Sequence, residues 1–213
     1  MPTFANIAFT PAVQALQTKD GSREAYARME RDAGPFTGLG VHEAEFIGKA
    51  DSFFMATVSE TGWPYVQHRG GPRGFVRLLT PMQLAFADLR GNRQFVSAGN
   101  VVRDDRVALI FMDYARRQRL KLLGHLRFID LADAATGLAA AVQLPDYRAR
   151  AERVAVIDIA ALDWNCPQHI TPRFTLPEIE SQVAPLRDRI AELEAELAAA
   201  RVAPDPPPPT VAV

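Results

Sequence analysis

Seven short apolar segments between residues 53 and 159 constrain the fold more than any other feature of the sequence. They cover residues 53–58, 65–69, 75–79, 83–88, 106–112, 120–128 and 154–159, and residues such as Gly, Pro and Asp separate them. In the sixth segment the apolar residues alternate with Lys121, His125 and Arg127, which is the period of a half-buried strand. Six or seven short strands at this spacing predict a barrel or a sandwich, and therefore a mainly β fold.

Helical patterns flank the strands. Thr10-Pro11 resembles a helix start, because Thr caps and Pro fits the first helical position, and Ser22 caps a second segment. Residues 41–49 read as a short helix, and shorter helices are expected over residues 93–98 and 131–143. We therefore expect an N-terminal helical extension over residues 1–50 and a strand-rich domain over residues 51–174.

A long C-terminal helix is expected over residues 175–202, followed by a disordered Pro-rich tail over residues 203–213. Apolar residues in this helix alternate at spacings of four and three, as in a heptad seam: Ile179, Val183, Leu186, Ile190, Leu193 and Leu197. Pro185 is expected to kink or restart the helix. The seam fits a helix packed on its own domain or a contact between two subunits.

Composition excludes several classes of protein. The chain of 213 residues has no apolar run of about 18 residues and no basic-then-apolar leader, so we expect neither a membrane span nor a secretory signal. Cys166 is the single cysteine, so no internal disulfide is possible, and a cytoplasmic protein is expected.

Positive charge is concentrated in the middle of the chain. Residues 66–127 contain twelve basic residues, eleven of them Arg, against four acidic ones, whereas the whole chain has a net charge of −1. Arginine binds carboxylate and phosphate through two parallel hydrogen bonds, so an anionic ligand is indicated. The sequence pI near 6.4 argues against a nucleic-acid partner.

Familiar catalytic and metal-binding motifs are weak. Gly38-Leu39-Gly40 lacks the third glycine of a dinucleotide fingerprint, since Glu43 stands there. Cys166 and His169 have no second pair at ligand spacing, so no metal is expected. The four histidines lie on different elements, and no catalytic side chain is assigned.

Three segments carry groups suited to binding. Residues 65–71 end a strand in polar groups and two glycines, and such glycines let backbone approach a flat ligand. Residues 86–100 run from a strand through a glycine turn to Asn92-Arg93, which we interpret as a helix start able to hold phosphate. Residues 161–173 form a stiff loop of aromatic, amide and cationic groups. The plain alternatives are a tight turn, an ordinary helix cap and a rigid connection to the last helix.

Together these segments resemble the pyridoxamine 5'-phosphate oxidase-related, FMN-binding split-barrel proteins. The resemblance covers about residues 46–173 and rests on residues 47–57, 67–71, 91–93, 97, 99–100, 119–128 and 164–169. It implies an α+β fold with a six-stranded split β-barrel and a homodimer with FMN at the interface.

The same resemblance implies which residues bind the cofactor. Arg69 and its neighbours would line the isoalloxazine edge, Asn92 and Arg93 would meet the phosphate, and the loop from Trp164 to Arg173 would approach from the side or from the other subunit. The full expected set is Gln67, His68, Arg69, Gly70, Gly71, Asp88, Asn92, Arg93, Ser97, Asn100, Arg117, Arg119, Lys121, Trp164, Gln168, His169 and Arg173.

The function expected from the resemblance is that of an FMN-dependent oxidoreductase of unknown substrate. The first fifty residues and the last forty have no counterpart, so a vitamin B6 substrate is not assigned. The alternatives are a flavin-binding redox sensor or carrier without turnover, and a haem or deazaflavin binder on the same fold.

Overall fold

The computed structural model describes residues 2–164 and 166–202. These residues form two compact units, Met1–Thr171 and Pro172–Val213. Helices and strands of the first unit are α1 (Phe4–Ala8), α2 (Pro11–Asp20), α3 (Arg23–Asp32), α4 (Val41–Lys49), β1 (Ser52–Val58), β2 (Pro64–Gly70), β3 (Arg77–Thr80), β4 (Gln83–Leu89), α5 (Val96–Arg103), β5 (Arg106–Asp113), β6 (Gln118–Asp130), α6 (Thr136–Ala141) and β7 (Ala151–Trp164). The second unit contains α7 (Leu176–Val202).

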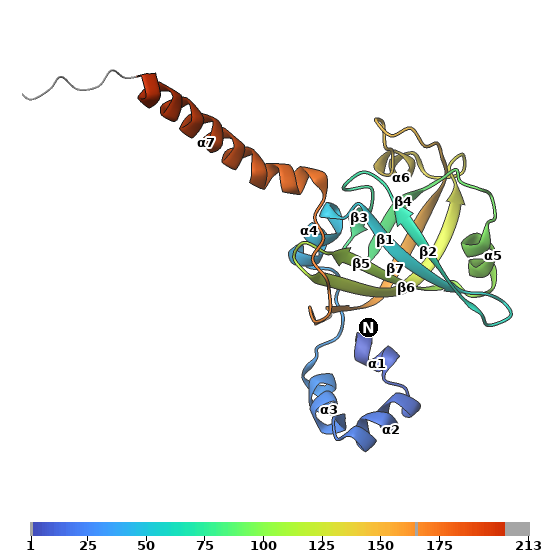
Figure 1. The fold of residues 1–213 in the computed structure, drawn as a ribbon. Coiled ribbons are helices and arrows are strands. Elements are labelled where there is room, and N and C mark those ends of the chain that lie inside the picture. Colours follow the sequence, from blue (N-terminus) through green and yellow to red (C-terminus); the bar gives the residue numbers. More distant parts are fainter. Residues whose placement is uncertain (1, 165, 203–213) are drawn as a thin grey trace, which may run out of the picture. The chain divides into compact units, whose positions relative to one another are not determined.

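The seven strands form one antiparallel sheet in the order β2-β1-β5-β6-β7-β4-β3. This sheet curves round on itself (Figure 1), and Arg69 of β2 reaches Asp88 of β4 although those two strands do not pair. The predicted α+β split-barrel class is confirmed, but the sheet has seven strands rather than the six that the resemblance implied, with the short strand β3 at its far edge.

Alternating apolar side chains fill the interior of the barrel, as the period-2 pattern of β6 predicts. Leu120, Leu122 and Leu126 of β6 are almost fully buried. Phe53 of β1 stacks on Phe111 of β5 with ring centroids 4.9 Å apart. Burial of such side chains contributes roughly 1.5–3 kcal/mol each and is the main force holding the sheet closed.

The middle of β7 is buried on both faces. Alternate residues face the barrel core, while Val154 and Val156 join a second cluster with Ala85 and Val142, against which Leu138 of α6 packs. A strand covered on both faces has a continuous apolar sequence, which explains the apolar run over residues 154–157.

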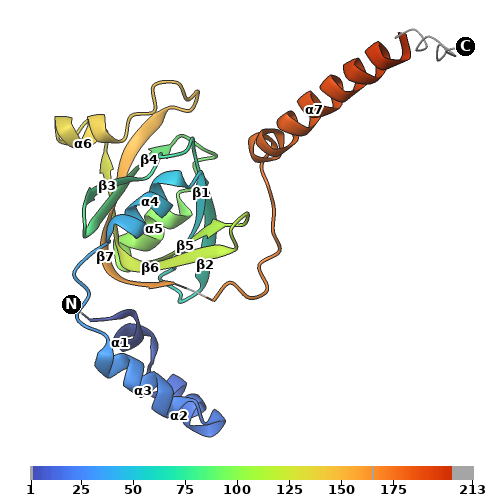
Figure 2. The same ribbon diagram turned by 90° about the vertical axis from the view of Figure 1, so that its left-hand side faces the viewer.

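Helices α4 and α5 lie at opposite ends of the barrel (Figure 1), and they overlap when the barrel is viewed along its length (Figure 2). Ile47 of α4 is buried in the core, and Phe46 packs against it. At the other end, Val101 of α5 packs against the same core. The core thus extends beyond the strands into the chain that precedes β1.

Several element boundaries differ from the sequence prediction. The third strand begins at Arg77 rather than residue 75, because Phe75 and Val76 are buried in the core before the strand pairs. The seventh strand continues to Trp164, paired with Leu120 across a bulge in the β6–β7 ladder. The helix expected over residues 131–143 is limited to α6.

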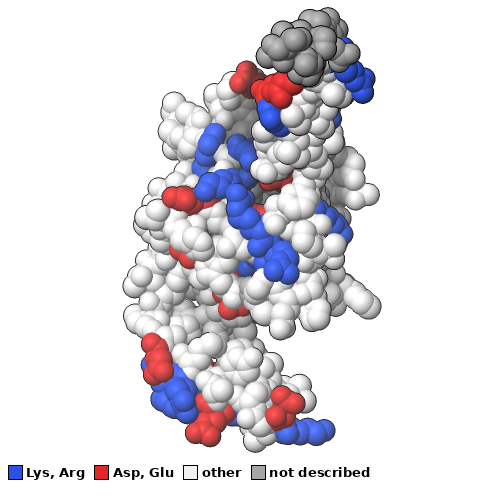
Figure 3. Space-filling view, turned by 60° about the vertical axis from the view of Figure 1, so that its left-hand side comes forward, with Lys and Arg blue, Asp and Glu red and all other residues white. Residues whose placement is uncertain are grey.

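The N-terminal helices include the expected start at Pro11. Helices α2 and α3 contact each other through Arg23, which donates to Glu30 and Gln17, and Tyr26 lies edge-on to Phe9. On the face of the molecule that Figure 3 shows, acidic and basic side chains are mixed over these helices. Basic side chains gather across the middle of that face.

Helix α7 is one continuous helix through Pro185, so the expected restart does not occur. Its start is capped by Thr175, whose backbone and hydroxyl donate to the Glu178 carboxylate. Residues 203–213, for which disorder is expected, lie outside the described residues, as do Met1 and Asn165.

Candidate functional site

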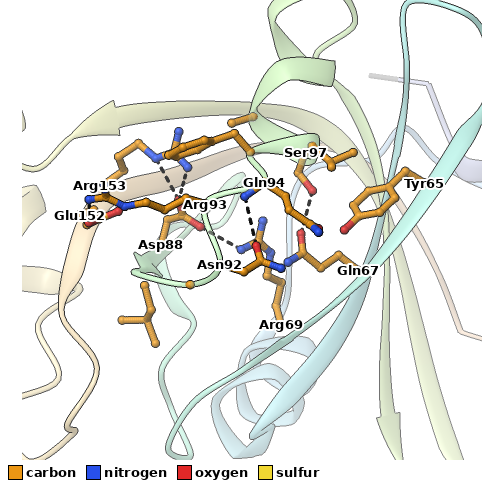
Figure 4. A pocket seen from close by; sticks show the side chains of 15 residues that line it. Tyr65, Gln67, Arg69, Asp88, Asn92, Arg93, Gln94, Ser97, Glu152 and Arg153 are labelled. Carbon is orange, nitrogen blue, oxygen red and sulfur yellow. Dashed lines mark hydrogen bonds and ion pairs between the residues drawn. The ribbon is translucent and has the colours of Figure 1, made fainter.

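A polar pocket lies where the ends of β2, β4 and β7 meet the loop before α5 (Figure 4). Its empty volume is about 510 Å³, counted with the solvent at its mouth. The lining residues are Tyr65, Gln67, Arg69, Asp88, Leu89, Gly91, Asn92, Arg93, Gln94, Phe95, Val96, Ser97, Ala98, Glu152 and Arg153. Six of the expected cofactor residues are therefore brought together here: Gln67, Arg69, Asp88, Asn92, Arg93 and Ser97.

Strand β2 supplies one wall of the pocket. Tyr65, Gln67 and Arg69 alternate along the strand, so all three side chains lie on one face. His68 lies on the opposite face, where its ring meets the edge of Phe54 at 5.5 Å. Of the expected cofactor residues in this strand, only Gln67 and Arg69 line the pocket.

Gly70 and Gly71 end β2 and serve packing. A Cβ on Gly71 would lie 2.7 Å from the Phe75 ring, so only glycine lets that buried ring approach the backbone. A Cβ on Gly70 would lie 3.0 Å from the ring of His68. These contacts explain the glycine pair without a ligand.

Asp88 at the end of β4 anchors two arginines. Its carboxylate accepts one hydrogen bond of 2.9 Å from Arg69 and two of 2.9 and 2.5 Å from Arg153. Only 6% of the Asp88 side chain is exposed. Because an unpaired charge is costly at such burial, this carboxylate fixes both guanidinium groups in place.

Arg153 is also held by aromatic rings. Its guanidinium carbon lies 4.5 Å from the centroid of Phe128 and 5.3 Å from that of Phe95. Cation–π contacts of this kind add about 0.5–2 kcal/mol. The arginine is therefore pre-organised before any ligand binds.

Glu152 holds the arginines on the rim. Its carboxylate lies 3.3 Å from Arg93 and 3.6 Å from Arg90. Arg93 remains 57% exposed, so this pair is weak and can be exchanged for a stronger anion.

The loop before α5 corrects the sequence interpretation. We expected Asn92-Arg93 to start the helix, but α5 begins at Val96. Asn92 instead accepts a hydrogen bond from the backbone of Gln94 at 3.1 Å, so it forms a local turn. A phosphate site at a helix start over residues 92–93 is therefore wrong, although both side chains do line the pocket.

Two residues of this loop have a left-handed backbone. Arg93 has φ of 60° and Phe95 has φ of 53°. Left-handed conformations of residues other than glycine cost roughly 1–3 kcal/mol and often mark functional sites. The loop thus carries a strained backbone that turns both side chains toward the pocket.

The start of α5 completes the pocket and ties it to the barrel. Ser97 donates to the Gln67 side chain at 3.1 Å across the pocket. Asn100, one turn further, is buried and donates to the Thr57 hydroxyl at 2.8 Å. Asn100 therefore holds α5 against β1 rather than lining the pocket.

The residues of this pocket fit a phosphate group. Arg69, Arg93 and Arg153 face two carboxylates, so the lining has a net charge of plus one. Among the described residues, the buried Nε of Arg69 has no hydrogen-bond partner. Hydroxyl and amide donors from Ser97, Asn92 and Gln94 lie around the same space. A compact anion would satisfy this set of donors.

A second group of expected residues lies away from the pocket. Arg119 and Lys121 belong to β6, and Arg117 lies in the turn before it with φ of 55°. Lys121 pairs with Asp163 at 3.5 Å. The buried Nε of Arg119 has no hydrogen-bond partner among the described residues.

Trp164 packs against α4 and not in the pocket. Its indole donates to Glu43 at 2.8 Å, and its ring meets Phe46 edge-on at 4.8 Å. Burial raises the pKa of Glu43, but hydrogen bonds from Trp164 and from the backbone N–H groups of Glu43 and Gly40 outweigh burial and lower the pKa overall. This environment matches the plain alternative, in which Trp164 is a packing residue.

The remaining expected residues follow β7. Gln168 and His169 are exposed, and His169 has a left-handed backbone with φ of 63°. Arg173 belongs to the second unit. None of the three lines the pocket.

The expected set lacks nine residues that line the pocket: Tyr65, Leu89, Gly91, Gln94, Phe95, Val96, Ala98, Glu152 and Arg153. Glu152 and Arg153 directly precede the predicted strand over residues 154–159, and a charged pair at a strand start is a signal that could have been used. The contact of Arg153 with Asp88 spans 65 residues, and local sequence patterns do not report contacts over such separations.

Within residues 2–164 and 166–202, no three His, Cys, Asp or Glu side chains gather in a way that could hold a metal ion. Over those same ranges, no helix combines the length and the apolar character needed to cross a membrane.

Comparison with solved structures gives distant matches. HupZ from Group A Streptococcus is 14% identical over 64% of this chain and 99% of its own, with a TM-score of 0.48. A putative pyridoxamine 5'-phosphate oxidase from Lactobacillus delbrueckii is 19% identical over 60% and 95%, with a TM-score of 0.46. An FMN-binding protein from Syntrophomonas wolfei is 10% identical over 70% and 97%, with a TM-score of 0.42.

No curated protein matches the sequence. Residues 42–165, more than half of the chain, match the family described as Pyridoxamine 5'-phosphate oxidase. The match begins in α4 and ends directly after β7, so it takes in the whole sheet and the pocket. The chain belongs to the pyridoxamine 5'-phosphate oxidase family of FMN-binding split barrels.

Proposed function

We propose that this protein binds FMN and acts as an FMN-dependent oxidoreductase, and that the pocket beside the loop before α5 holds the FMN phosphate. The observation that carries the proposal is the net positive lining built from Arg69, Arg93 and Arg153, with Asp88 fixing two of them. FMN ends in a phosphate monoester, which pairs best with arginine and hydroxyl donors.

In this proposal each side chain has a defined task. Arg93 leaves Glu152 and pairs with the phosphate, the Ser97 hydroxyl turns from Gln67 to a phosphate oxygen, and the Asn92 amide donates to another. Arg69 and Arg153 hold positive potential at the floor of the pocket and remain bound to Asp88. Bound FMN supplies the redox chemistry, and the protein supplies position and charge.

We further propose that a second copy of the chain completes the flavin site. The residues that the family resemblance assigns to the flavin but that lie outside the pocket include Arg119, whose buried Nε has no partner among the described residues. In a two-fold homodimer, Arg117, Arg119 and Lys121 of one copy would reach the flavin held by the other. Light scattering at micromolar concentration tests this proposal, and a flavin-loaded monomer would contradict it.

A carrier or sensor without turnover is the second candidate. It is favoured by the pocket lining, in which the carboxylates of Asp88 and Glu152 both form ion pairs with arginine. Rapid reduction by a nicotinamide cofactor followed by reoxidation in air supports the enzyme, whereas bound flavin that no donor reduces supports the carrier.

Titration of cofactor into purified protein tests the proposed function. Arg93→Ala removes a charge-assisted contact worth about 1.5–3 kcal/mol, so FMN should bind roughly 10- to 150-fold more weakly. Riboflavin lacks the phosphate and should bind both proteins equally. Arg90→Ala is the matched control, because Arg90 shares the partner Glu152 but does not line the pocket.

Unchanged FMN affinity in Arg93→Ala would contradict the proposed role of the pocket. The visible spectrum of the purified protein tests the cofactor itself. FMN gives a yellow protein that releases FMN on denaturation, whereas a haem or deazaflavin spectrum would overturn the assignment.

A further inference from the structure

Helix α7 presents an apolar seam that its own unit, Pro172–Val213, leaves largely uncovered. The seam consists of Ile179, Val183, Leu186, Ile190, Leu193 and Leu197, and five of these side chains are between 45% and 63% exposed. Val183 is partly buried. Exposure of so many large aliphatic residues on one helix is unusual unless a partner covers them.

We propose that the α7 seam pairs with the α7 seam of a second copy of this chain in a parallel, two-stranded coiled coil. The spacing of four and three residues places the seam at the a and d positions of a heptad, with Ile179 and Leu197 at its two ends. Between them, Val183 and Ile190 occupy a and Leu186 and Leu193 occupy d. β-branched residues at a with leucine at d favour two strands.

Charges beside the seam favour the same partner. In a parallel pair in register, Arg189 at position g lies beside Glu194 at position e of the other helix, and Glu196 lies beside Arg201. Both contacts are attractive, and symmetry repeats each of them. The helix therefore complements itself in charge as well as in apolar pattern.

An antiparallel pair fits less well. The antiparallel register that includes Ile179 would place Arg187 against Arg187 and Arg189 against Arg189 of the other helix. Like charges at these positions are unfavourable. Shifting by one heptad removes the repulsion but leaves Ile179 without a partner and sets Val183 against Ala200.

The ion pairs within the helix do not compete strongly with this assembly. Arg187 lies 2.7 Å from Glu180, and Arg189 lies 2.8 Å from Glu192, with all four side chains more than half exposed. Exposed pairs of this kind contribute about 0–1 kcal/mol, so they can exchange for contacts to the second helix. Pro185 occupies position c, away from the seam, so it does not interrupt the pairing.

Disulfide crosslinking of the full-length protein tests the orientation directly. The background is Cys166→Ser, which removes the single native thiol. Val183→Cys in this background places one thiol at position a, where two helices in a parallel pair bring the Cα atoms within the roughly 7 Å that a disulfide requires. In the shifted antiparallel pair the same residues lie about 25 Å apart along the axis.

We expect Val183→Cys to double in mass on a non-reducing gel under mild oxidation. Ala184→Cys, its neighbour on the outer side, is the matched control and should remain monomeric on the gel. Arg189→Glu should suppress the crosslink, and Glu194→Arg added to it should restore the crosslink, because the swap exchanges the two charges.

Any of three results would overturn the proposal. Failure of Val183→Cys to crosslink would mean that the seam packs elsewhere, on its own chain included. Equal crosslinking of Ala184→Cys would mean that the two helices meet without a fixed register. A crosslink that forms only between Val183→Cys and Ala200→Cys chains would assign the antiparallel pair. FMN binding is expected to be unchanged in all these variants, so the two proposals fail independently.

Discussion

Replacing Asp88 by asparagine removes the charge that organises the floor of the pocket while keeping the shape of the side chain. Asp88→Asn leaves Arg69 and Arg153 without the carboxylate that accepts three hydrogen bonds from them. The side chains of these arginines are only 16% and 21% exposed, so water compensates little for the lost partner. The folded state should therefore lose stability.

The expected loss follows from burial. Breaking a buried ion pair by removing one partner costs about 3–5 kcal/mol, because the remaining charge stays desolvated. Part of the contact survives through the Phe128 and Phe95 rings around Arg153, so we expect a value toward the lower end, about 3 kcal/mol. Asp104→Asn is the matched control, since Asp104 pairs with an Arg106 that is 75% exposed.

Urea unfolding followed by circular dichroism measures both variants against the unchanged protein at neutral pH. The control should unfold at a urea concentration closer to that of the unchanged protein than Asp88→Asn does, because water screens an exposed ion pair. If Asp88→Asn unfolds at the same urea concentration as the control, the two arginines are not held by Asp88, and the account of the pocket floor is wrong.

Three other substitutions probe separate parts of the structure. Glu152→Gln releases Arg93 from its resting partner and should tighten FMN binding by up to about fivefold without changing riboflavin binding, and unchanged FMN affinity would refute this. Glu43→Gln should destabilise the protein at pH 7, since a carboxylate whose pKa is lowered from 4.5 stabilises the fold above that pH, and the gap in urea stability should close as pH falls below 4.5. Gly124→Ala would place a Cβ 2.6 Å from the Asp158 carbonyl oxygen and should cost about 1–3 kcal/mol in the same assay, and an unchanged midpoint would show that the β6–β7 bulge adapts.

The strands were predictable because their signal is local. Alternation in β6 follows directly from one face packing on the core, and the turn residues between segments mark where each strand ends. The extension of β7 to Trp164 was not predictable, because it depends on pairing with β6 across a bulge. The register between two strands depends on the contacts between them, so the sequence of either strand alone gives little indication of it.

The start of α5 was predicted wrongly for a similar reason. Asn92 is suited both to cap a helix and to close a local turn, and the sequence does not distinguish the two. The left-handed backbone at Arg93 and Phe95 shows that this segment forms the turn and not the start of a helix. In this conformation Arg93 contacts Glu152 and Phe95 contacts Arg153, and both partners are distant in the sequence.

The concentration of arginine did indicate where the candidate site lies. Two of the arginines between residues 66 and 127, Arg69 and Arg93, line the pocket, but the rest of that group do not. Arg106 and Arg116, for example, pair with nearby acids on the surface. Charge count alone therefore predicted an anionic ligand but did not predict which residues line the pocket.

A crystal structure of the protein with FMN bound is the most direct test of the proposed site. The account predicts that phosphate oxygens lie within about 3 Å of Arg93 and Ser97, and that Arg93 has moved away from Glu152 while Arg69 and Arg153 still contact Asp88. A phosphate bound elsewhere, with Arg93 still paired to Glu152, would contradict it.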